Sequence, residues 1–289
     1  MKFSTIGILV KPHSEDVRET LEKLLAYLHG KDCTVFLDES ADGLVDSKIK
    51  LVSRGEIGEK CDLAITIGGD GTILNAARSL ADKHVPLVGI NIGRLGFLAD
   101  VSPDDINVTL NNILSGDYIE EERFLLKAEI YRNNKVIFCA EALNDVVVHV
   151  RDVARMIEFE TYINQHFVNH QRADGLIVST PTGSTAYALS NGGPILHADL
   201  NAITLVPICP HTLSSRPIVV KDNSEIEVII GETKQAIAQV ACDGQTSFDV
   251  KSGDKIRITR KENTITLLHP KEHNNFEILR AKLHWSEHT

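Results

Sequence analysis

Cysteine is scarce in this sequence and shows no pairing pattern. The 289 residues include five cysteines, an odd number, with no Cys-x-x-Cys spacing, and most of them lie in apolar runs. We therefore expect reduced, buried thiols of a cytoplasmic protein rather than a disulfide framework. The twelve histidines show no His-Glu-x-x-His or similar spacing, so we expect no structural zinc site.

Long apolar runs and excess positive charge are also lacking. No apolar stretch reaches the ~18 residues of a membrane-spanning helix, and the first five residues lack a signal-peptide core. The formal net charge of −10 argues against nonspecific binding to nucleic acid or to an anionic membrane. Hydrophobic residues make up 43%, and the length fits one large domain or two ordinary ones.

The first ~115 residues alternate between strand and helix patterns. Such alternation predicts an α/β domain with a parallel sheet and flanking helices, and ligands of such sheets gather at the carboxyl ends of the strands. Ser14 is the expected N-cap of the first helix and Ser102 that of the last. We expect strands over 3–10, 33–37, 62–67 and 87–91, and helices over 14–29, 47–60, 73–83 and 102–116.

The pattern changes near residue 120 to short strands, which predicts a β-rich C-terminal domain. Arg132-Asn133-Asn134 lies between two of these strands and indicates a hairpin. We expect domains over 1–120 and 121–270, with a helix in 271–289 that packs back on the N-terminal domain. The expected strands cover 125–131, 135–139, 142–150, 154–162, 175–179, 203–206, 225–230, 236–241, 255–259 and 264–268, and the last helix covers 274–285.

The segment Gly68-Gly69-Asp70-Gly71-Thr72 connects an apolar strand pattern to a helix pattern. A glycine-rich turn at a helix N-terminus suits a phosphate, and the glycines allow positive φ and the close approach of a ligand. A carboxylate there repels phosphate unless it holds a metal, accepts a proton or binds a hydroxyl, which makes Asp70 the best candidate for chemistry. The alternative is a tight turn with Asp70 as a local cap. The Walker pattern is absent.

Further polar residues interrupt the β-rich part. The segment 172–194 combines hydroxyls and glycines with Tyr187, whose ring could stack on a base, although a Ser/Thr-rich loop with Tyr187 in the core is the alternative. Asn144 and Asp145 lie inside an apolar run, where polar side chains need partners, and ribose hydroxyls would suit them. The alternative is a β-bulge or a turn capped by Asn144. Arg155 and Arg172 could face a phosphate or simply solvent.

Together these blocks resemble the NAD kinase family, specifically its bacterial type, over essentially the whole chain. The matching segments are GGDGT at 68–72, NIGRLGFL at 91–98, LND at 143–145, MIEFE at 156–160, RADGLIVSTPTGSTAYALSNGGPI at 172–195, PICPHTLSSRPIVV at 207–220 and CDGQ at 242–245. The GGDGT turn is shared with lipid kinases and resembles that of phosphofructokinases, whereas the long central block is far more specific.

The resemblance implies phosphorylation of the adenosine-ribose 2′-hydroxyl of NAD by ATP with a divalent metal, for which Mg²⁺ is the first candidate. It implies an NAD site between the two domains, and a homodimer or homotetramer. Asp70 matches the proton acceptor, and Asn144 with Asp145 matches the ribose-binding pair, where the family often has Glu second. The implied dinucleotide contacts are Gly71, Arg155, Arg172, Asp174, Thr185, Ala186, Tyr187, Ala188, Leu189, Ser190 and Gln245.

Two other functions fit parts of the sequence. One is another GGDGT-type kinase acting on a lipid or sugar, although the composition indicates no membrane-facing patch. The other is a non-catalytic sensor of NAD or NADP, which would gain little from a carboxylate beside phosphate. A dehydrogenase is disfavoured, because no Gly-x-Gly-x-x-Gly follows the first strand.

Overall fold

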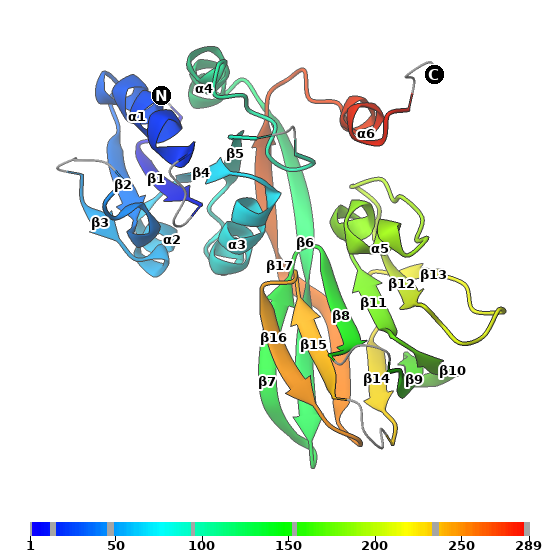
Figure 1. Ribbon diagram of the computed structural model, residues 1–289. Coiled ribbons are helices and arrows are strands. Elements are labelled where there is room, and N and C mark those ends of the chain that lie inside the picture. The colour runs from blue at the N-terminus through cyan, green and yellow to red at the C-terminus, as the bar shows by residue number, and fades with distance from the viewer. Residues whose placement is uncertain are drawn as a thin grey trace. The chain divides into compact units, whose positions relative to one another are not determined.

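The computed structural model describes residues 2–11, 16–44, 49–93, 96–151, 155–232 and 237–285 (Figure 1). Two compact units make up the chain. Unit 1 consists of Met1–Glu122 and Thr264–Thr289, and unit 2 consists of Arg123–Asn263. Unit 1 therefore contains both ends of the sequence.

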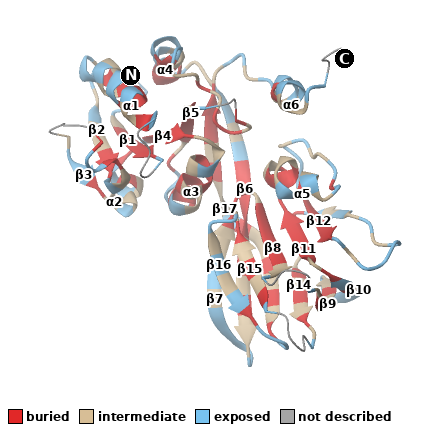
Figure 2. Ribbon diagram, in the orientation of Figure 1, coloured by how far each residue is buried: buried red, intermediate tan, exposed pale blue. Residues whose placement is uncertain are grey.

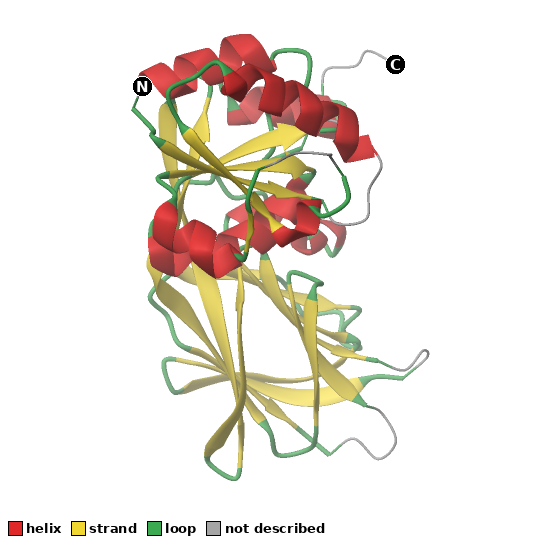
Figure 3. Cartoon of the chain, turned by 90° about the vertical axis from the view of Figure 1, so that its left-hand side faces the viewer, coloured by secondary structure: helices red, strands yellow, loops and turns green. Residues whose placement is uncertain are grey.

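Unit 1 is built on a parallel sheet in the order β3-β2-β1-β4-β5, as the alternating pattern predicts. Helices flank its strands on two sides (Figure 3). The elements are β1 Thr5–Val10, α1 Asp16–His29, β2 Thr34–Asp38, η1 Glu39–Ala41, β3 Leu51–Val52, α2 Arg54–Lys60, β4 Leu63–Gly68, α3 Asp70–Leu80, η2 Ala81–Lys83, β5 Leu87–Asn91, α4 Ile106–Ser115 and α6 Asn275–Leu283.

The central strands of unit 1 are buried along their whole length (Figure 2). β4 and β5 read as continuous apolar runs because helices cover both faces of a parallel sheet. Ile65 in β4 and Val88 in β5 belong to one core cluster with Leu21 and Leu24 of α1 and Leu110 of α4. This core fixes the end of β4, where the GGDGT turn begins.

Three local expectations for unit 1 need correction. The helix expected over 47–60 is only α2, because Leu51–Val52 pairs with β2 as a short strand and Ser53 caps the helix. The helix expected from Ser102 begins at Ile106, and Ser102 instead accepts a hydrogen bond from Asp104 N–H in the preceding turn. It does end at Gly116, which has φ +96°. The expected N-cap Ser14 lies outside the described residues.

Unit 2 consists almost entirely of strands, so the β-rich prediction is confirmed. Its core cluster takes residues from both of its sheets, such as Val148 of β8 and Phe159 of β9. The elements are β6 Ile119–Arg132, β7 Lys135–Ala142, β8 Asp145–Val150, β9 Ile157–Ile163, β10 His166–Ala173, β11 Gly175–Ser179, η3 Thr182–Thr185, α5 Tyr187–Ser190, β12 Ala202–Ile208, β13 Ile218–Lys221, β14 Ile226–Ile230, β15 Ala238–Cys242, β16 Thr246–Val250 and β17 Lys255–His269.

The strand pattern of unit 2 was only partly predictable. The hairpin is confirmed, since Arg132 pairs with Lys135 around Asn133 and Asn134, which have φ 50° and 60°. β10, β13 and β16 were not expected, because most residues of each strand are exposed or only partly buried. The two strands expected over 255–259 and 264–268 are the single strand β17.

The cysteine prediction was wrong for two positions. All five cysteines are free, but Cys139 and Cys209 are exposed rather than buried. Cys139 faces solvent because it lies in β7, most of whose residues are not buried. Burial does raise the pKa of Cys61 to about 11.

Candidate active site

Asp70 is the first residue of α3 and follows the extended residue Gly69. Its carboxylate accepts hydrogen bonds from three successive backbone N–H groups: Phe97 at 2.9 Å, Leu98 at 3.0 Å and Ala99 at 3.2 Å. These donors lie in the loop that follows β5, and β5 is the strand beside β4. The side chain is thereby held at the carboxyl ends of two adjacent parallel strands.

The three donors leave part of the carboxylate available. Among the described residues, Oδ1 accepts from Leu98 and Ala99, whereas Oδ2 accepts only from Phe97. A carboxylate offers about four acceptor positions, so one on Oδ2 remains for a substrate hydroxyl or a cation. The local-cap alternative does not describe Asp70, because its hydrogen bonds run to another loop rather than to its own turn.

The glycines around Asp70 matter because they lack a Cβ and leave room for neighbouring atoms, not because they have positive φ. The described glycines with positive φ are Gly43, Gly116, Gly192, Gly244 and Gly253, so the expectation for 68–71 was wrong. A Cβ on Gly68 would collide with Thr72, and a Cβ on Gly96 would collide with Asp70 Oδ1. These glycines permit close packing around the carboxylate.

Unit 2 contains a pocket of about 320 Å³. Four of the residues expected to bind NAD line it: Asn144, Asp145, Ala186 and Tyr187. Tyr187 is 46% exposed, which excludes the alternative that its ring belongs to a core. The remaining lining residues are Val147, His149, Ala241, Asp243 and Gly244.

Asn144 and Asp145 are positioned by a second carboxylate that binds successive backbone N–H groups, that of Asp243. Asp243 accepts hydrogen bonds from the backbone N–H groups of Leu143 at 3.0 Å, Asn144 at 2.8 Å and Asp145 at 3.3 Å. Asn144 lies in the bend between β7 and β8, and Asp145 begins β8, so the expected continuous strand over 142–150 is wrong. The bend directs this polar pair to the pocket instead of leaving it inside a sheet.

Burial, and to a smaller extent the negative charge of Asp243, raise the pKa of Asp145 to about 7. Asp145 is only 5% exposed, so water cannot stabilise its charged form. A ligand that donates hydrogen bonds to this carboxylate would supply the missing stabilisation.

The hydroxyl-rich segment packs on the same bend. Thr180 Oγ1 donates to the carbonyl of Leu143 at 2.6 Å and accepts from Gly183 N–H at 3.1 Å. A Cβ on Gly183 would collide with the backbone of Asn144. This close approach explains why Ala186 and Tyr187 share a pocket with Asn144.

Two family models match the chain. The ATP-NAD kinase N-terminal domain matches residues 6–118, and the ATP-NAD kinase C-terminal domain matches residues 143–269. The chain belongs to the ATP-NAD kinase family. The predicted resemblance is therefore confirmed, and the protein is an enzyme that phosphorylates NAD with ATP.

Relatives of similar length support membership in the ATP-NAD kinase family. The NAD kinase of Nitrosococcus oceani is 50% identical over 98% of this chain and 97% of its own. The NAD kinase of Chromohalobacter salexigens is 52% identical over 98% of this chain and 97% of its own.

Solved structures show the same fold. An Archaeoglobus fulgidus NAD kinase in complex with ATP is similar with a TM-score of 0.73 and 27% identity, over 96% of this chain and 99% of its own. A yeast NADH kinase in complex with NADH has a TM-score of 0.91 at 24% identity, over 100% of this chain and 90% of its own. In the described part of this chain, no helix is long and apolar enough to cross a membrane.

The other residues that the family resemblance implies lie outside the lining of the unit 2 pocket. Asp70 and Gly71 belong to unit 1. Ala188 is fully buried against β11 and β12, so its side chain is a packing residue. Arg155, Arg172, Ser190 and Gln245 are exposed, and Asp174, Thr185 and Leu189 are partly buried. The α5 helix has only four residues, so its N-terminus is too short to form an anion site by itself.

Sequence reasoning missed the residues that hold the candidate groups in place. Asp243 lies in a turn after β15, where both it and Gly244 have positive φ values. The additional role of its carboxylate carries no local signal, because its partners lie about a hundred residues earlier. Gly96, Phe97 and Leu98 lie in the matching segment 91–98 and Ala99 directly follows it, but their contact with Asp70 was not predicted.

Proposed function

We propose that the protein transfers the γ-phosphate of ATP to the 2′-hydroxyl of the adenosine ribose of NAD, with a divalent metal, and releases NADP and ADP. Family membership supports the overall reaction. The observation that supports our assignment of the chemistry is the clamped carboxylate of Asp70, with one acceptor position left on Oδ2.

Asp70 acts as the general base in this proposal. A ribose hydroxyl is a poor nucleophile at neutral pH, and a carboxylate within hydrogen-bond distance can accept its proton as it attacks phosphorus. General-base catalysis contributes about 10²–10⁴-fold. The three N–H donors keep the carboxylate in one orientation, so little reorganisation is needed at the moment of transfer.

A divalent metal fits this donor set. Mg²⁺ prefers oxygen ligands and is held largely by substrate phosphates, with one or two carboxylates from the protein. The remaining acceptor position of Asp70 Oδ2 is an oxygen of this kind. The metal would neutralise charge on the transferring phosphoryl group, and the chain's own part is to hold Asp70 in place.

We assign the nucleoside half of NAD to the unit 2 pocket. The Asn144 amide and the Asp145 carboxylate suit vicinal ribose hydroxyls, since the two side chains together offer donors and acceptors. Tyr187 supplies an exposed ring at the pocket, where a base can stack. Arg172, Asp174, Gln245 and the stretch from Thr185 to Ser190 remain proposed dinucleotide contacts, as does Arg155.

We also propose a homodimer or homotetramer located in the cytoplasm. Exposed apolar side chains at Leu213, Ile218 and Val219 favour association of β13 and its preceding loop with another copy. Five free cysteines fit a reducing compartment. Light scattering of the purified protein determines the number of copies.

The first experiment is a coupled assay of purified protein with NAD, ATP and Mg²⁺, in which an NADP-specific dehydrogenase reports NADP. We expect Asp70→Asn to lower kcat at least ~100-fold, because the amide cannot accept the proton. NAD affinity should stay largely unchanged, since the substitution conserves shape. Near-normal turnover in this variant would falsify the base assignment. Binding of NAD without any NADP formation in the wild type would favour the sensor alternative.

A further inference from the structure

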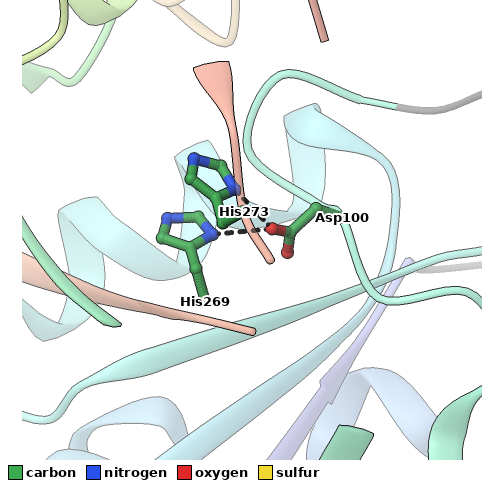
Figure 4. A group of neighbouring side chains, drawn as sticks. All are labelled: Asp100, His269 and His273. Atoms are coloured by element: carbon green, nitrogen blue, oxygen red, sulfur yellow. Dashed lines mark hydrogen bonds and ion pairs between the residues drawn. The ribbon is translucent and has the colours of Figure 1, made fainter. Parts of the chain in front are cut away.

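Unit 1 contains a buried cluster of two histidines and an aspartate away from the GGDGT turn. Asp100 follows the loop that clamps Asp70, His269 ends β17, and His273 lies just before Asn274, the N-cap of α6. Both imidazoles point their Nδ1 atoms at the same oxygen, Asp100 Oδ2, at 2.9 Å for His269 and 2.7 Å for His273 (Figure 4). The two rings stack with their centroids 3.9 Å apart.

The cluster is almost completely removed from solvent. The side chains of Asp100, His269 and His273 are 9%, 2% and 4% exposed. Among the described residues, Asp100 Oδ1 has no hydrogen-bond partner although it is buried. A buried acceptor without a donor destabilises the fold, so this oxygen calls for a positively charged or hydrogen-donating group.

The outer nitrogens of both rings face oxygen acceptors. His269 Nε2 lies 3.4 Å from a carboxylate oxygen of Glu121, and His273 Nε2 lies 3.3 Å from Asn275 Oδ1. In this structure Nδ1 of each ring donates to Asp100 Oδ2, and among the described residues His269 Nε2 forms no hydrogen bond. A metal that replaces the Nδ1 protons would bind these nitrogens, while the outer acceptors favour a proton on Nε2. Metal-binding histidines have this arrangement, in which an outer carboxylate or carbonyl orients each ring.

We propose that Asp100, His269 and His273 form a binding site for a divalent first-row transition metal, with Zn²⁺ as its first candidate. The proposed ligands are Nδ1 of each histidine and the Asp100 carboxylate, and one ligand atom from each of the three residues lies within 4.8 Å of the others. Zinc takes nitrogen and oxygen ligands at about 2.0–2.2 Å, which places neighbouring ligands about 3.3 Å apart. The Nδ1–Oδ2 separations of 2.9 and 2.7 Å would have to widen by about half an ångström to reach this value.

The ligand atoms of this site differ from those that bind the metal ion of ATP. Imidazole nitrogen suits Zn²⁺, Ni²⁺ or Cu²⁺, whereas Mg²⁺ prefers oxygen ligands. The charges agree with a bound cation, because two carboxylates face this cluster. The carboxylates of Asp100 and Glu121 both face the imidazole of His269, at 2.9 and 3.4 Å.

The position of the site indicates a structural function. Asp100 directly follows Ala99, whose N–H donates to Asp70. His269 and His273 flank the turn between β17 and α6, so a metal would link this turn to the loop that orients the carboxylate of Asp70. This proposal contradicts our expectation of no zinc site. His269 and His273 are four positions apart in the sequence, a spacing that we did not recognise. Asp100 lies 169 positions before His269.

The test uses the full-length protein, stripped with a chelator and titrated with Zn²⁺ by calorimetry without nucleotides. We expect one Zn²⁺ per chain at this site and a higher Tm with Zn²⁺. Co²⁺ should give visible absorption bands of a nitrogen- and oxygen-ligated ion. Because no step depends on NADP formation, failure of the proposed kinase chemistry would leave this result untouched.

His273→Gln removes one ligand, and we expect it to weaken Zn²⁺ binding at least ~100-fold and to abolish the Tm shift, since even outer residues of metal sites contribute 10–100-fold. The matched control is His166→Gln, an exposed histidine in β10 of unit 2, which should bind as the wild type does. Asp100→Asn provides a second variant if His273→Gln misfolds by circular dichroism. Absence of Zn²⁺ and Co²⁺ binding in the wild type, or equal binding in the ligand variants, would show an ion-paired cluster without a metal and overturn the proposal.

Discussion

Asp70 and Asp243 are held by the same device. Each carboxylate accepts hydrogen bonds from three consecutive backbone N–H groups, 97–99 for Asp70 and 143–145 for Asp243. Hydrogen bonds to a charged acceptor are stronger than neutral ones, so each clamp orders a loop as well as a side chain. In our proposal the first clamp orients the general base, and the second presents the ribose-binding pair.

The role of Gly96 leads to a prediction at this scale. We expect Gly96→Ala to lower kcat about 10–100-fold, because its Cβ would displace the Asp70 carboxylate, and small misplacements of a catalytic group have effects of this size. Steady-state kinetics of NADP formation measures the change.

The matched control is Gly55→Ala in α2, where the nearest atom to the added Cβ would be Ser53 Oγ at 3.8 Å. This variant should keep full activity. Equal kcat values for the two variants would contradict the role of Gly96.

Helix α2 shows how a short element is specified locally. Ser53 Oγ accepts from Glu56 N–H, and Glu56 accepts in return from Ser53 N–H, both at 3.3 Å. This capping box begins the helix at Arg54 and separates it from β3. The local signal thus outweighs the longer helical pattern that we had read over 47–60.

Ser53→Ala should lower the free energy of unfolding by about 1 kcal/mol, because the backbone N–H of Glu56 at the helix start loses its acceptor. Urea denaturation followed by circular dichroism measures this change.

Ser79→Ala is the control, since Ser79 Oγ only donates to the carbonyl of Asn75 within α3. It should change stability by less than ~0.5 kcal/mol. A loss as large as that of Ser53→Ala would mean that the capping box contributes nothing specific.

At the scale of the whole molecule, the buried carboxyl of Asp145 makes stability depend on pH. Its pKa rises from the ordinary 3.8 to about 7 in the folded, ligand-free protein. Between these values the folded state binds the proton and the unfolded state does not. The contribution of this group to stability is therefore complete below pH ~4 and is lost as the pH rises through ~7.

Asp145→Asn should remove this dependence. We expect the stability of the wild type relative to the variant to fall with pH in this window, by at most about 1.4 kcal/mol per pH unit. Urea denaturation of both proteins at several pH values from 4 to 8, without NAD, gives the difference. A constant difference over this range would show that Asp145 titrates as an ordinary exposed carboxyl group.

The sequence by itself determined the local structure of this protein. The apolar run before Gly68 and the helical pattern after Asp70 identify a strand, a turn and a helix, because backbone preference and burial depend on neighbouring residues. The hairpin at Asn133 and Asn134 follows for the same reason, since asparagine tolerates positive φ. The family motifs added the reaction and the identity of Asp70.

Only the tertiary structure decided which distant residues meet. The contacts of Asp70 with 97–99, of Asp243 with 143–145 and of Asp100 with His269 depend on strand order and register. Strand order and register produce no periodic pattern in the sequence around these aspartates. A carboxylate in a turn has the same local pattern whether it faces water or three amides, and the difference arises only when separate loops fold against each other.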